Sequence, residues 1–283
     1  MSDSKHSSRR TFLIGAGGIG SALAGGVALG VGGLDRQQPK SNGKVALVTG
    51  SSRGIGAATA RRLARDGFAV TVNCEKSRDL AAAVVEEIDA AGGRATWVQA
   101  DVSDAGAVRR LFDETERAFG GVDVVISNAG IMRLAPFDAM SDADFARMVD
   151  VNQKGSFLVL REAARRVRDG GSIIALSSSI TQLRTATYGA YAATKSAQEI
   201  FVSALAKELE GRRISVNAIA PGVVNTSLFT GGKTAEQIAG FVQRTPHKRL
   251  GEPADVANVI SALCSADGHW VNGQTVLANG GLV

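Results

Sequence analysis

Tyr191 and Lys195 stand four positions apart in the chain, and Ser178 precedes Tyr191 by thirteen positions. On a helix, residues four apart share a face, so the lysine would place a positive charge beside the phenol. A phenol ionises near pH 10 in water, and a neighbouring cation lowers its pKa toward neutrality. With a serine hydroxyl to hold a substrate oxygen, these residue types predict acid–base chemistry at a carbonyl or an alcohol. The same Tyr–Lys spacing also arises by chance on amphipathic helices, so its meaning depends on the rest of the chain.

A glycine-rich segment lies between an expected strand and an expected helix. Residues 45–48 are apolar, Gly50, Gly54 and Gly56 follow with Gly-x3-Gly-x-Gly spacing, and residues 57–64 repeat apolar residues with helical periodicity. Strand, glycine turn and helix in this order are the setting of a dinucleotide-binding fingerprint. Glycines let the backbone approach a pyrophosphate, and the N-terminus of the following helix offers N–H groups to it. The segment therefore predicts a nucleotide site.

A second glycine run, residues 15–20, matches the commoner Gly-x-Gly-x2-Gly spacing. We reject it as a nucleotide site because only residues 12–14 precede it as a possible strand. The sequence after it is rich in Gly and Ala rather than amphipathic, and no second strand with a terminal acid follows at the right distance. A fingerprint without its flanking elements is a weak signal.

Several short motifs follow one another in an order that points to one family. They are Thr49-Gly50-x3-Gly54-Ile55-Gly56, Asp101-Val102, Asn128-Ala129-Gly130, Asn152, Ser178, Tyr191-x3-Lys195 and Pro221-Gly222. Through these motifs, residues from about 43 to 283 resemble the single-domain type of the short-chain dehydrogenase/reductase family. The 3-oxoacyl-[acyl-carrier-protein] reductases are the nearest named group. Each motif is short, but their order and spacing together are specific.

The resemblance implies a catalytic role for four residues. Tyr191 would be the general acid when a ketone is reduced and the base when an alcohol is oxidised. Lys195 would lower the pKa of Tyr191 and hydrogen-bond the nicotinamide ribose. Ser178 would orient and polarise the substrate carbonyl, and Asn152 would hold a water that links Lys195 to solvent.

The resemblance also implies a set of cofactor-binding residues, with Asp101 and Val102 around the adenine ring and Thr226 on the nicotinamide carboxamide. The set is Gly50, Ser52, Arg53, Gly54, Ile55, Gly56, Cys74, Asp101, Val102, Asn128, Ala129, Gly130, Tyr191, Lys195, Pro221, Gly222, Val224 and Thr226. Where this chain has Ser127, the family usually has Asn, a mild departure. Tyr188 lacks a cation four residues on, so we expect it to line the pocket or to pack.

The choice between NAD(H) and NADP(H) depends on what faces the adenosine ribose. NAD-preferring proteins place an acid at the end of the second strand, but here that position holds the neutral Cys74. Arg53 carries a planar fork of donors that suits a 2′-phosphate, although it could also be a solvated turn residue. A shift of one residue would instead bring Glu75 to the ribose. The sequence favours NADP(H).

Apolar runs and helical stretches alternate along most of the chain. The expected strands are residues 45–49, 69–73, 95–99, 122–126, 172–176, 214–219 and 275–278, and the clearest helices between them are residues 79–91, 105–119, 142–167 and 254–264. Such alternation predicts an α/β, doubly wound (Rossmann-type) domain with a seven-stranded parallel sheet and helices on both faces. We place this domain at residues 44–283. Residues 227–250 break the pattern, and the family resemblance implies that they form a lid over the substrate.

Residues 1–43 are expected to be a twin-arginine-like signal or anchor followed by a linker. Residues 8–13 read SRRTFL, uncharged sequence runs from residue 11 to 34, and residues 22–24 offer a cleavage site. The uncharged run is long enough to span a bilayer, so an uncleaved anchor is an alternative. We expect a periplasmic or membrane-anchored protein whose membrane contact is confined to residues 11–34; the alternative is a cytoplasmic protein.

Composition excludes two other classes of function. The formal charge of +5 is modest and shows no basic stripe with interleaved aromatic residues, so nucleic-acid binding is not indicated. Cys74 and Cys264 have neither a CxxC motif nor a histidine partner, so no metal site is expected.

Together, these features predict an NADP(H)-dependent oxidoreductase that transfers a hydride between the nicotinamide and a small carbonyl or alcohol substrate. A 3-oxoacyl thioester is one possible substrate, and steroid, sugar and small-ketone chemistries share the scaffold. The alternative is a nucleotide-binding sensor or scaffold without turnover. The resemblance further implies a homotetramer or homodimer packed through the helices that carry Asn152 and Tyr191.

Overall fold

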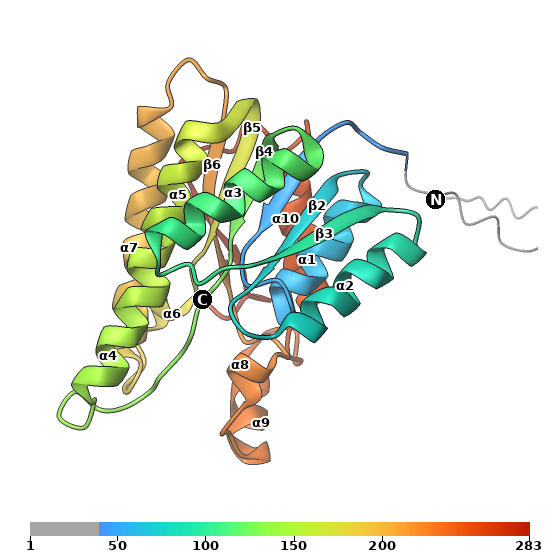
Figure 1. Ribbon diagram of the computed structural model, residues 1–283. Helices are drawn as coiled ribbons and strands as arrows, with labels where there is room; N and C mark the ends of the chain where they lie inside the picture. Colours follow the sequence, from blue (N-terminus) through green and yellow to red (C-terminus); the bar gives the residue numbers. More distant parts are fainter. Residues whose placement is uncertain (1–39) are drawn as a thin grey trace, which may run out of the picture. The chain divides into compact units, whose positions relative to one another are not determined.

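Seven parallel strands form a single sheet in the computed structural model, which describes residues 40–283 (Figure 1). The order across the sheet is β3-β2-β1-β4-β5-β6-β7, so the direction of winding reverses between β1 and β4. The strands are β1 (Val45–Val48), β2 (Ala69–Cys74), β3 (Arg94–Gln99), β4 (Val122–Ser127), β5 (Val167–Leu176), β6 (Ser215–Pro221) and β7 (Thr275–Ala278). This arrangement confirms the predicted fold class. The reversal matters because ligands of such sheets bind beside it, at the carboxyl ends of the strands.

Two layers of helices cover the sheet (Figure 1). One layer contains α1 (Gly54–Arg65), α2 (Arg78–Ala90) and α10 (Pro253–Leu263), and the other contains α3 (Ala105–Phe119), α5 (Gly155–Arg166) and α7 (Gly189–Glu208). Each layer closes its own hydrophobic core against the sheet, one centred on Leu63 and Ile260 and the other on Phe112 and Val159. Because both faces are covered, β1 and β2 are buried along their whole length.

The expected single helix over residues 142–167 is instead three consecutive segments. They are α4 (Asp142–Met148), a π-helix η1 (Val149–Lys154) and α5, after which Val167 already belongs to β5. A π-turn has wider i→i+5 hydrogen bonding and is frequent at functional sites; here Gly155 N–H donates to the Asp150 carbonyl. The prediction missed it because one wider turn leaves the apolar periodicity on either side almost unchanged. Asn152 lies inside this π-turn.

Three short helices lie at the carboxyl end of the sheet, where the lid was expected. They are α6 (Ile180–Leu183), α8 (Ser227–Thr230) and α9 (Ala235–Arg244). Residues 227–250 are thus partly helical: Thr234 and Gln237 form a capping box that starts α9. Figure 1 shows α8 and α9 standing away from the sheet below the ends of the strands.

The predictions for the N-terminal region fall on residues 1–39, which lie outside the described residues. They concern the twin-arginine pattern, the glycine run at 15–20, the uncharged run at 11–34 and the cleavage site. The domain boundary at residue 44 likewise stays a prediction. Among residues 40–283, no helix combines the length and the apolar character needed to cross a membrane.

Candidate active site

Two cavities meet at the carboxyl ends of the strands, beside the point where the winding reverses. The larger, about 620 Å³, follows the glycine turn from Glu75 and Asp101 to Leu228. The smaller, about 130 Å³, contains Tyr191 and Ser178. Both cavities share the lining residues Ile55, Asn128, Gly130, Thr226 and Leu228. A ligand in the larger cavity would therefore reach the smaller one.

The predicted cofactor residues divide between these two cavities. The larger is lined by Gly50, Ser52, Arg53, Gly54, Ile55, Gly56, Cys74, Asp101, Val102, Asn128, Ala129, Gly130 and Thr226. The smaller is lined by Ser178, Tyr191, Lys195, Pro221, Gly222 and Val224, together with the shared residues. Among the predicted site residues, only Asn152 lines neither cavity.

The glycine turn is tightly packed against the end of β4. Gly50 has a φ of +60°, and a Cβ there would lie 2.7 Å from the Cα of Ala129. A Cβ at Gly56 would lie 2.5 Å from Nδ2 of Asn128, which donates hydrogen bonds of 2.8 Å to the Thr49 carbonyl and 3.0 Å to the Gly50 carbonyl. Asn128 therefore braces the turn, and the turn requires glycines because other backbone approaches it too closely for a side chain.

The start of α1 fits a pyrophosphate. Arg53 occupies the N-cap without a side-chain capping bond, and the first turn holds no acidic residue. Gly54 has a φ of +58°, and Ile55 and Gly56 face the larger cavity. N–H groups at a helix start, left uncapped beside a cavity, are suited to an anionic ligand. The chemistry of this cavity thus fits the dinucleotide that the sequence implied.

At the end of the larger cavity where the adenosine is expected lie Arg53, which forms no ion pair with residues 40–283, and Glu75, which is ion-paired. Arg53 donates a hydrogen bond to Oγ of Ser77 at the start of α2. Glu75 Oε1 lies 3.1 Å from Nη2 of Arg147, and the same nitrogen lies 3.3 Å from Oδ2 of Asp101. If Glu75 were to bind the ribose hydroxyls, as in the alternative considered above, the ribose would have to compete with Arg147 for its carboxylate.

Asp101 is held as a carboxylate. Burial works to raise the pKa of Asp101, but hydrogen bonds from Ser103 and the charge of Arg147 together lower it below its usual value. Oδ1 of Asp101 accepts from the Ser103 N–H at 2.9 Å and from the Ser103 hydroxyl at 2.7 Å. The wall beside the expected adenine is therefore fixed by its own hydrogen bonds.

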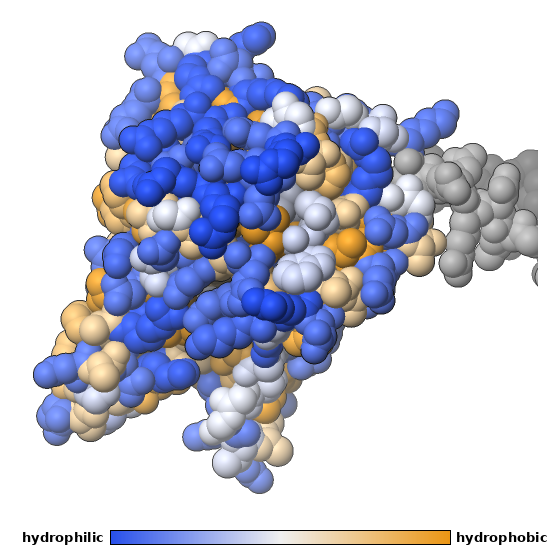
Figure 2. Space-filling view, viewed as in Figure 1, coloured by the Kyte–Doolittle hydropathy of each residue, from blue (hydrophilic) through white to orange (hydrophobic). Residues whose placement is uncertain are grey.

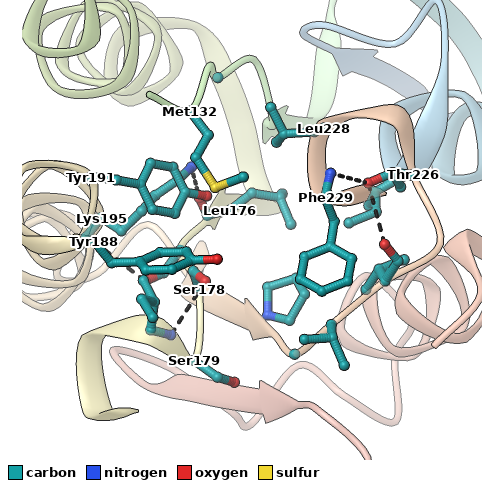
Figure 3. Close-up of a pocket in the computed structure, with 18 of the residues that line it drawn as sticks. Met132, Leu176, Ser178, Ser179, Tyr188, Tyr191, Lys195, Thr226, Leu228 and Phe229 are labelled. Carbon is teal, nitrogen blue, oxygen red and sulfur yellow. Dashed lines mark hydrogen bonds between the residues drawn. The ribbon is translucent and has the colours of Figure 1, made fainter. Parts of the chain in front are cut away.

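Tyr191, Ser178 and Lys195 gather at one side of the smaller cavity, as predicted from their spacing (Figure 3). Ser178 follows β5, while Tyr191 and Lys195 lie one turn apart on α7. The Ser178 side chain lies close enough to Tyr191 to act on the pKa of its hydroxyl, and Ser178 Oγ accepts from the Ile180 N–H at 3.3 Å. Lys195 Nζ lies 5.9 Å from the centre of the Tyr191 ring. Two hydroxyl groups therefore converge on one point of the cavity wall.

The expected lowering of the Tyr191 pKa does not hold in this arrangement. Burial raises the pKa of Tyr191 above its usual value, the Ser178 hydrogen bond offsets only part of that rise, and Tyr188 adds to it. Burial also lowers the pKa of Lys195 to about 8. The physical reason is that both groups lie in the protein interior, where desolvation disfavours the phenolate and the ammonium alike. Tyr191 is accordingly a protonated donor at neutral pH.

Asn152 is fully buried and bonded to the loop after β4. Its Oδ1 accepts from the Ile131 N–H at 2.8 Å, and its Nδ2 donates to the Ile131 carbonyl at 2.8 Å and to Thr194 Oγ1 at 3.1 Å. A Cβ at Gly130 would lie 3.3 Å from Asn152 Oδ1 and 3.4 Å from Lys195 Nζ. Asn152 thus stands close to Lys195, with only the small Gly130 between the two groups.

The remaining wall of the smaller cavity is mostly apolar. Figure 3 shows Tyr188, Tyr191 and Ser178 on one side and Leu228, Phe229 and Thr226 on the other. The Phe229 and Phe241 rings lie 5.3 Å apart in an edge-to-face arrangement that joins α8 to α9. In the described chain, Lys195 is the one charged residue among those lining this cavity. The cavity can therefore bind an uncharged carbonyl compound against an apolar surface.

Four residues that support the site were not singled out from the sequence: Asn73, Ser77, Arg147 and Glu199. Asn73 accepts from the Gly50 N–H at 3.1 Å, so it supports the glycine turn. It could have been noticed as the one amide in β2, a strand that is otherwise apolar apart from Thr71. The other three act across elements far apart in sequence, and no local pattern marks them.

A family model, a related sequence and two solved structures that resemble this chain are all described as reductases, oxidoreductases or dehydrogenases. A family model described as enoyl-(acyl carrier protein) reductase matches residues 50–283. An uncharacterised oxidoreductase of Methylorubrum extorquens is 43% identical over 245 residues, which cover 86% of this chain and 99% of the relative. The crystal structure of a short-chain dehydrogenase from Burkholderia cenocepacia in complex with NADP has a TM-score of 0.81 and 36% identity, covering 87% of this chain and 99% of that one. An angucycline C-6 ketoreductase with bound NADP has a TM-score of 0.81 and 34% identity, with coverage of 87% and 96%.

Proposed function

The chain belongs to the short-chain dehydrogenase/reductase family, and on this basis we propose that it is an NADP(H)-dependent reductase of uncharged, apolar ketones. The observation that carries the proposal is the convergence of the Ser178 and Tyr191 hydroxyls on an apolar cavity that opens into the glycine-turn cavity. The reverse reaction, oxidation of the corresponding alcohol, uses the same groups.

Reduction of a ketone needs a hydride at the carbonyl carbon and a proton at the oxygen. The nicotinamide, when bound, supplies the hydride. Tyr191 donates its hydroxyl proton to the carbonyl oxygen, and its raised pKa keeps that proton available at neutral pH. Ser178 donates a hydrogen bond to the same oxygen and so holds it beside the phenol. The product is an alcohol, and Tyr191 is left as a phenolate.

Lys195 and Asn152 act after the proton has left Tyr191. The Lys195 ammonium, buried beside the ring, stabilises the phenolate electrostatically. Asn152 holds the loop at Ile131 in place next to Lys195, and a water there would return a proton from solvent. These assignments follow the residue-by-residue resemblance and the burial of both side chains.

The preference for NADP(H) is supported by charge at the adenosine end. Arg53 is exposed at the mouth of the cavity and bonded to Ser77, so the two side chains together offer donors to a 2′-phosphate. The two similar structures with bound NADP agree with this choice.

The preference for an uncharged substrate is supported by the lining of the smaller cavity. A carboxylate there would lose its hydration without a partner other than Lys195, and a substrate ammonium would face Lys195 directly. Lys233 and Arg244, on residues 227–250, do not line the cavity. Lys233 Nζ and the Arg244 guanidinium each lie 4.6 Å from the centre of a phenylalanine ring, Phe229 and Phe241 respectively.

We also propose assembly into a homodimer or homotetramer through α5 and α7. Phe157 on α5 and Ile200 on α7 are exposed, and the Phe157 ring lies 6.0 Å from that of Phe201. Figure 2 shows hydrophobic surface along the side where α4, α5 and α7 lie in Figure 1. Exposed apolar side chains on neighbouring helices mark contact surfaces. Light scattering of the wild type and of Ile200→Glu tests this; a wild-type monomer would contradict it.

For the N-terminal region, we propose twin-arginine export or anchoring on the sequence pattern at residues 8–34 alone. N-terminal sequencing of the native protein tests it. A mature terminus after residue 24 would support cleavage, and an intact terminus on protein found in the cytoplasm would contradict export.

The reductase proposal is tested by NADPH oxidation with a matched set of carbonyl compounds. Acetophenone and 1-tetralone represent apolar ketones, a short 3-oxoacyl thioester represents carrier-like substrates, and ethyl acetoacetate with acetoacetate forms a pair that differs by one charge. We expect turnover of the apolar ketones and of ethyl acetoacetate, with at least tenfold lower kcat/KM for acetoacetate, about the cost of one poorly solvated charge. NADPH binding without turnover of any compound would favour a sensor and contradict the proposal.

A further inference from the structure

Ser178 lies between two residues whose hydroxyl groups are bound by one carboxylate. Oε1 of Glu199 accepts a hydrogen bond of 2.5 Å from Ser177 Oγ and one of 3.0 Å from Thr181 Oγ1. Ser177 precedes Ser178 directly, and Thr181 follows it by three positions, inside α6. One side chain thus holds both ends of the short segment that presents the Ser178 hydroxyl.

Glu199 belongs to the same helix as the acid–base pair. It lies on α7, four residues after Lys195 and eight after Tyr191, so it follows them by one and two turns. It is not among the residues that line the cavity around Ser178. Glu199 therefore links the Ser178 segment to the helix that carries Tyr191 without facing the substrate.

The other bonds of this segment mostly run to the sheet. The Ser177 N–H donates to the Ile219 carbonyl at 2.7 Å and the Ser179 N–H to the Pro221 carbonyl at 2.9 Å. These two bonds fix the position of the segment relative to β6, whereas the position of Tyr191 is set by α7. The distance between the two hydroxyls depends on what joins the segment to α7. Two side chains of α7 form bonds there: Glu199 accepts from Ser177 and Thr181, and Lys195 donates to the carbonyl of Leu176, just before the segment.

Each hydroxyl has another acceptor within reach, and the carboxylate is the stronger one. Ser177 Oγ lies 3.4 Å from the Lys195 carbonyl, and Thr181 Oγ1 lies 3.0 Å from the Ser178 carbonyl. A hydroxyl has a single hydrogen, so each donates to one acceptor at a time. Hydrogen bonds to a carboxylate are shorter and about twice as strong as those to a neutral acceptor. Both hydroxyls therefore favour Glu199.

We propose that Glu199 is a positioning residue: by binding Ser177 and Thr181, it sets the Ser178 hydroxyl at the distance from Tyr191 that proton donation to a shared carbonyl oxygen requires. This inference rests on the proposed ketone reduction, because that reaction is what the two hydroxyls perform together. A misplacement of about 1 Å in such a pair can cost on the order of a hundredfold in rate.

Three variants separate the hydrogen bonds from the rest of the side chain. Glu199→Leu removes the acceptor, Glu199→Gln keeps an oxygen that can accept both bonds, and Glu208→Leu is the matched control. Glu208 is an exposed acid on the same helix, and its side chain makes no hydrogen bond or ion pair with residues 40–283. We expect Glu199→Leu to lower kcat for an apolar ketone by about ten- to a hundredfold, with KM and the NADPH dissociation constant within about threefold of wild type.

Glu199→Gln and the control Glu208→Leu are compared with Glu199→Leu. We expect Glu199→Gln and Glu208→Leu to keep kcat within about threefold of wild type. Equal losses in Glu199→Gln and Glu199→Leu would mean that the charge matters and the two bonds do not, which overturns the proposal. An unchanged kcat in Glu199→Leu overturns it as well.

A double-mutant cycle shows whether Glu199 acts through the two hydroxyls. Ser177→Ala with Thr181→Val should lower kcat in the wild type but add less than about twofold in the Glu199→Leu background, because the bonds are already gone. Losses that multiply would show independent effects and contradict the proposal. If Glu199→Leu does not fold, the Ser177→Ala and Thr181→Val variants remove the same bonds singly and must each lower kcat.

A measurement without turnover distinguishes this inference from the proposed function. Hydrogen exchange of peptides covering residues 177–184 should be at least tenfold faster in Glu199→Leu than in the wild type and unchanged in Glu199→Gln. If the wild type reduces no ketone but exchange behaves in this way, the reductase proposal fails while the linkage of the segment to α7 stands. Equal exchange in all variants overturns the linkage itself.

Discussion

Lys195 donates a hydrogen bond of 2.5 Å from Nζ to the carbonyl oxygen of Leu176, the last residue of β5. Lys195 lies on α7, and Leu176 lies two positions before Ser178, so this bond joins the helix of the acid–base pair to the strand that leads to the serine. It also holds an ammonium group in the interior, with the Lys195 residue 4% exposed. Because burial disfavours the ammonium form, this charge makes the stability of the fold depend on pH.

The free energy of unfolding should rise with pH because of Lys195. Its pKa is lowered by burial from 10.5 to about 8, so between these values the unfolded chain binds more protons than the folded one. By linkage, stability increases as pH rises through this window, by at most about 3 kcal/mol. Urea denaturation of the wild type and Lys195→Met between pH 7 and 9.5 should show the wild type gaining relative to the variant. Parallel curves would show that Lys195 does not titrate in this range.

Tyr191→Phe should abolish most turnover while leaving nucleotide binding intact. The ring stays in place, but the proton donor is lost, and a positioned general acid contributes about a hundred- to ten-thousandfold in rate. We expect kcat to fall by that factor, with the NADPH dissociation constant from fluorescence titration within about twofold. Tyr188→Phe is the control, since Tyr188 lines the same cavity. A Tyr191→Phe enzyme with more than about a tenth of wild-type kcat would assign the proton to another group.

Arg53→Ala should weaken binding of NADPH far more than binding of NADH. The guanidinium is exposed beside Ser77, where it would meet a 2′-phosphate, and hydrogen bonds to charged groups contribute about 1.5–3 kcal/mol. This corresponds to roughly ten- to a hundredfold in the NADPH dissociation constant, with NADH nearly unchanged. Arg65→Ala, an exposed arginine elsewhere on α1, is the control. Equal losses for the two nucleotides would contradict NADP(H) preference.

Arg147→Gln should shift nucleotide preference toward NADH, because it removes one of the two cations paired with Glu75. Oε1 of Glu75 lies 3.1 Å from the Arg147 guanidinium and 3.1 Å from Nζ of the exposed Lys76. An exposed pair contributes little, so without Arg147 the carboxylate beside the ribose would bind hydroxyls and repel a 2′-phosphate. We expect the ratio of NADPH to NADH dissociation constants to rise at least fivefold, about 1 kcal/mol, as for a like-charge contact at a partly exposed site.

The paired variant Arg147→Gln with Glu75→Gln provides the control for that shift. Removing the acid as well should return the ratio to within about twofold of wild type. If the ratio stays high in the double variant, the effect comes from Asp101 or from altered packing of α4, and the role given to Glu75 is wrong.

The seven strands and most helices were predictable because a parallel sheet that is buried on both faces requires apolar strands, and these recur along the sequence as apolar runs. The runs at 45–49, 69–73 and 275–278 differ from β1, β2 and β7 by at most one residue. The prediction failed where the local pattern of apolar residues does not reveal the structure. The examples are the π-turn at Val149–Lys154 and the additional residues at the start of β5.

The sequence by itself determined which residue types could do chemistry and in what order they come along the chain: the glycine turn, Ser178, and the Tyr191–Lys195 pair. Their spacing is a local property, so it could be recognised without coordinates. Only the tertiary structure decided how these groups are held and charged. Glu199 reaches across to Ser177 and Thr181, Arg147 to Glu75, and burial raises the Tyr191 pKa where spacing alone predicted a lower one. Desolvation and contacts between distant segments arise only when the chain is packed, and no local pattern of residues encodes them.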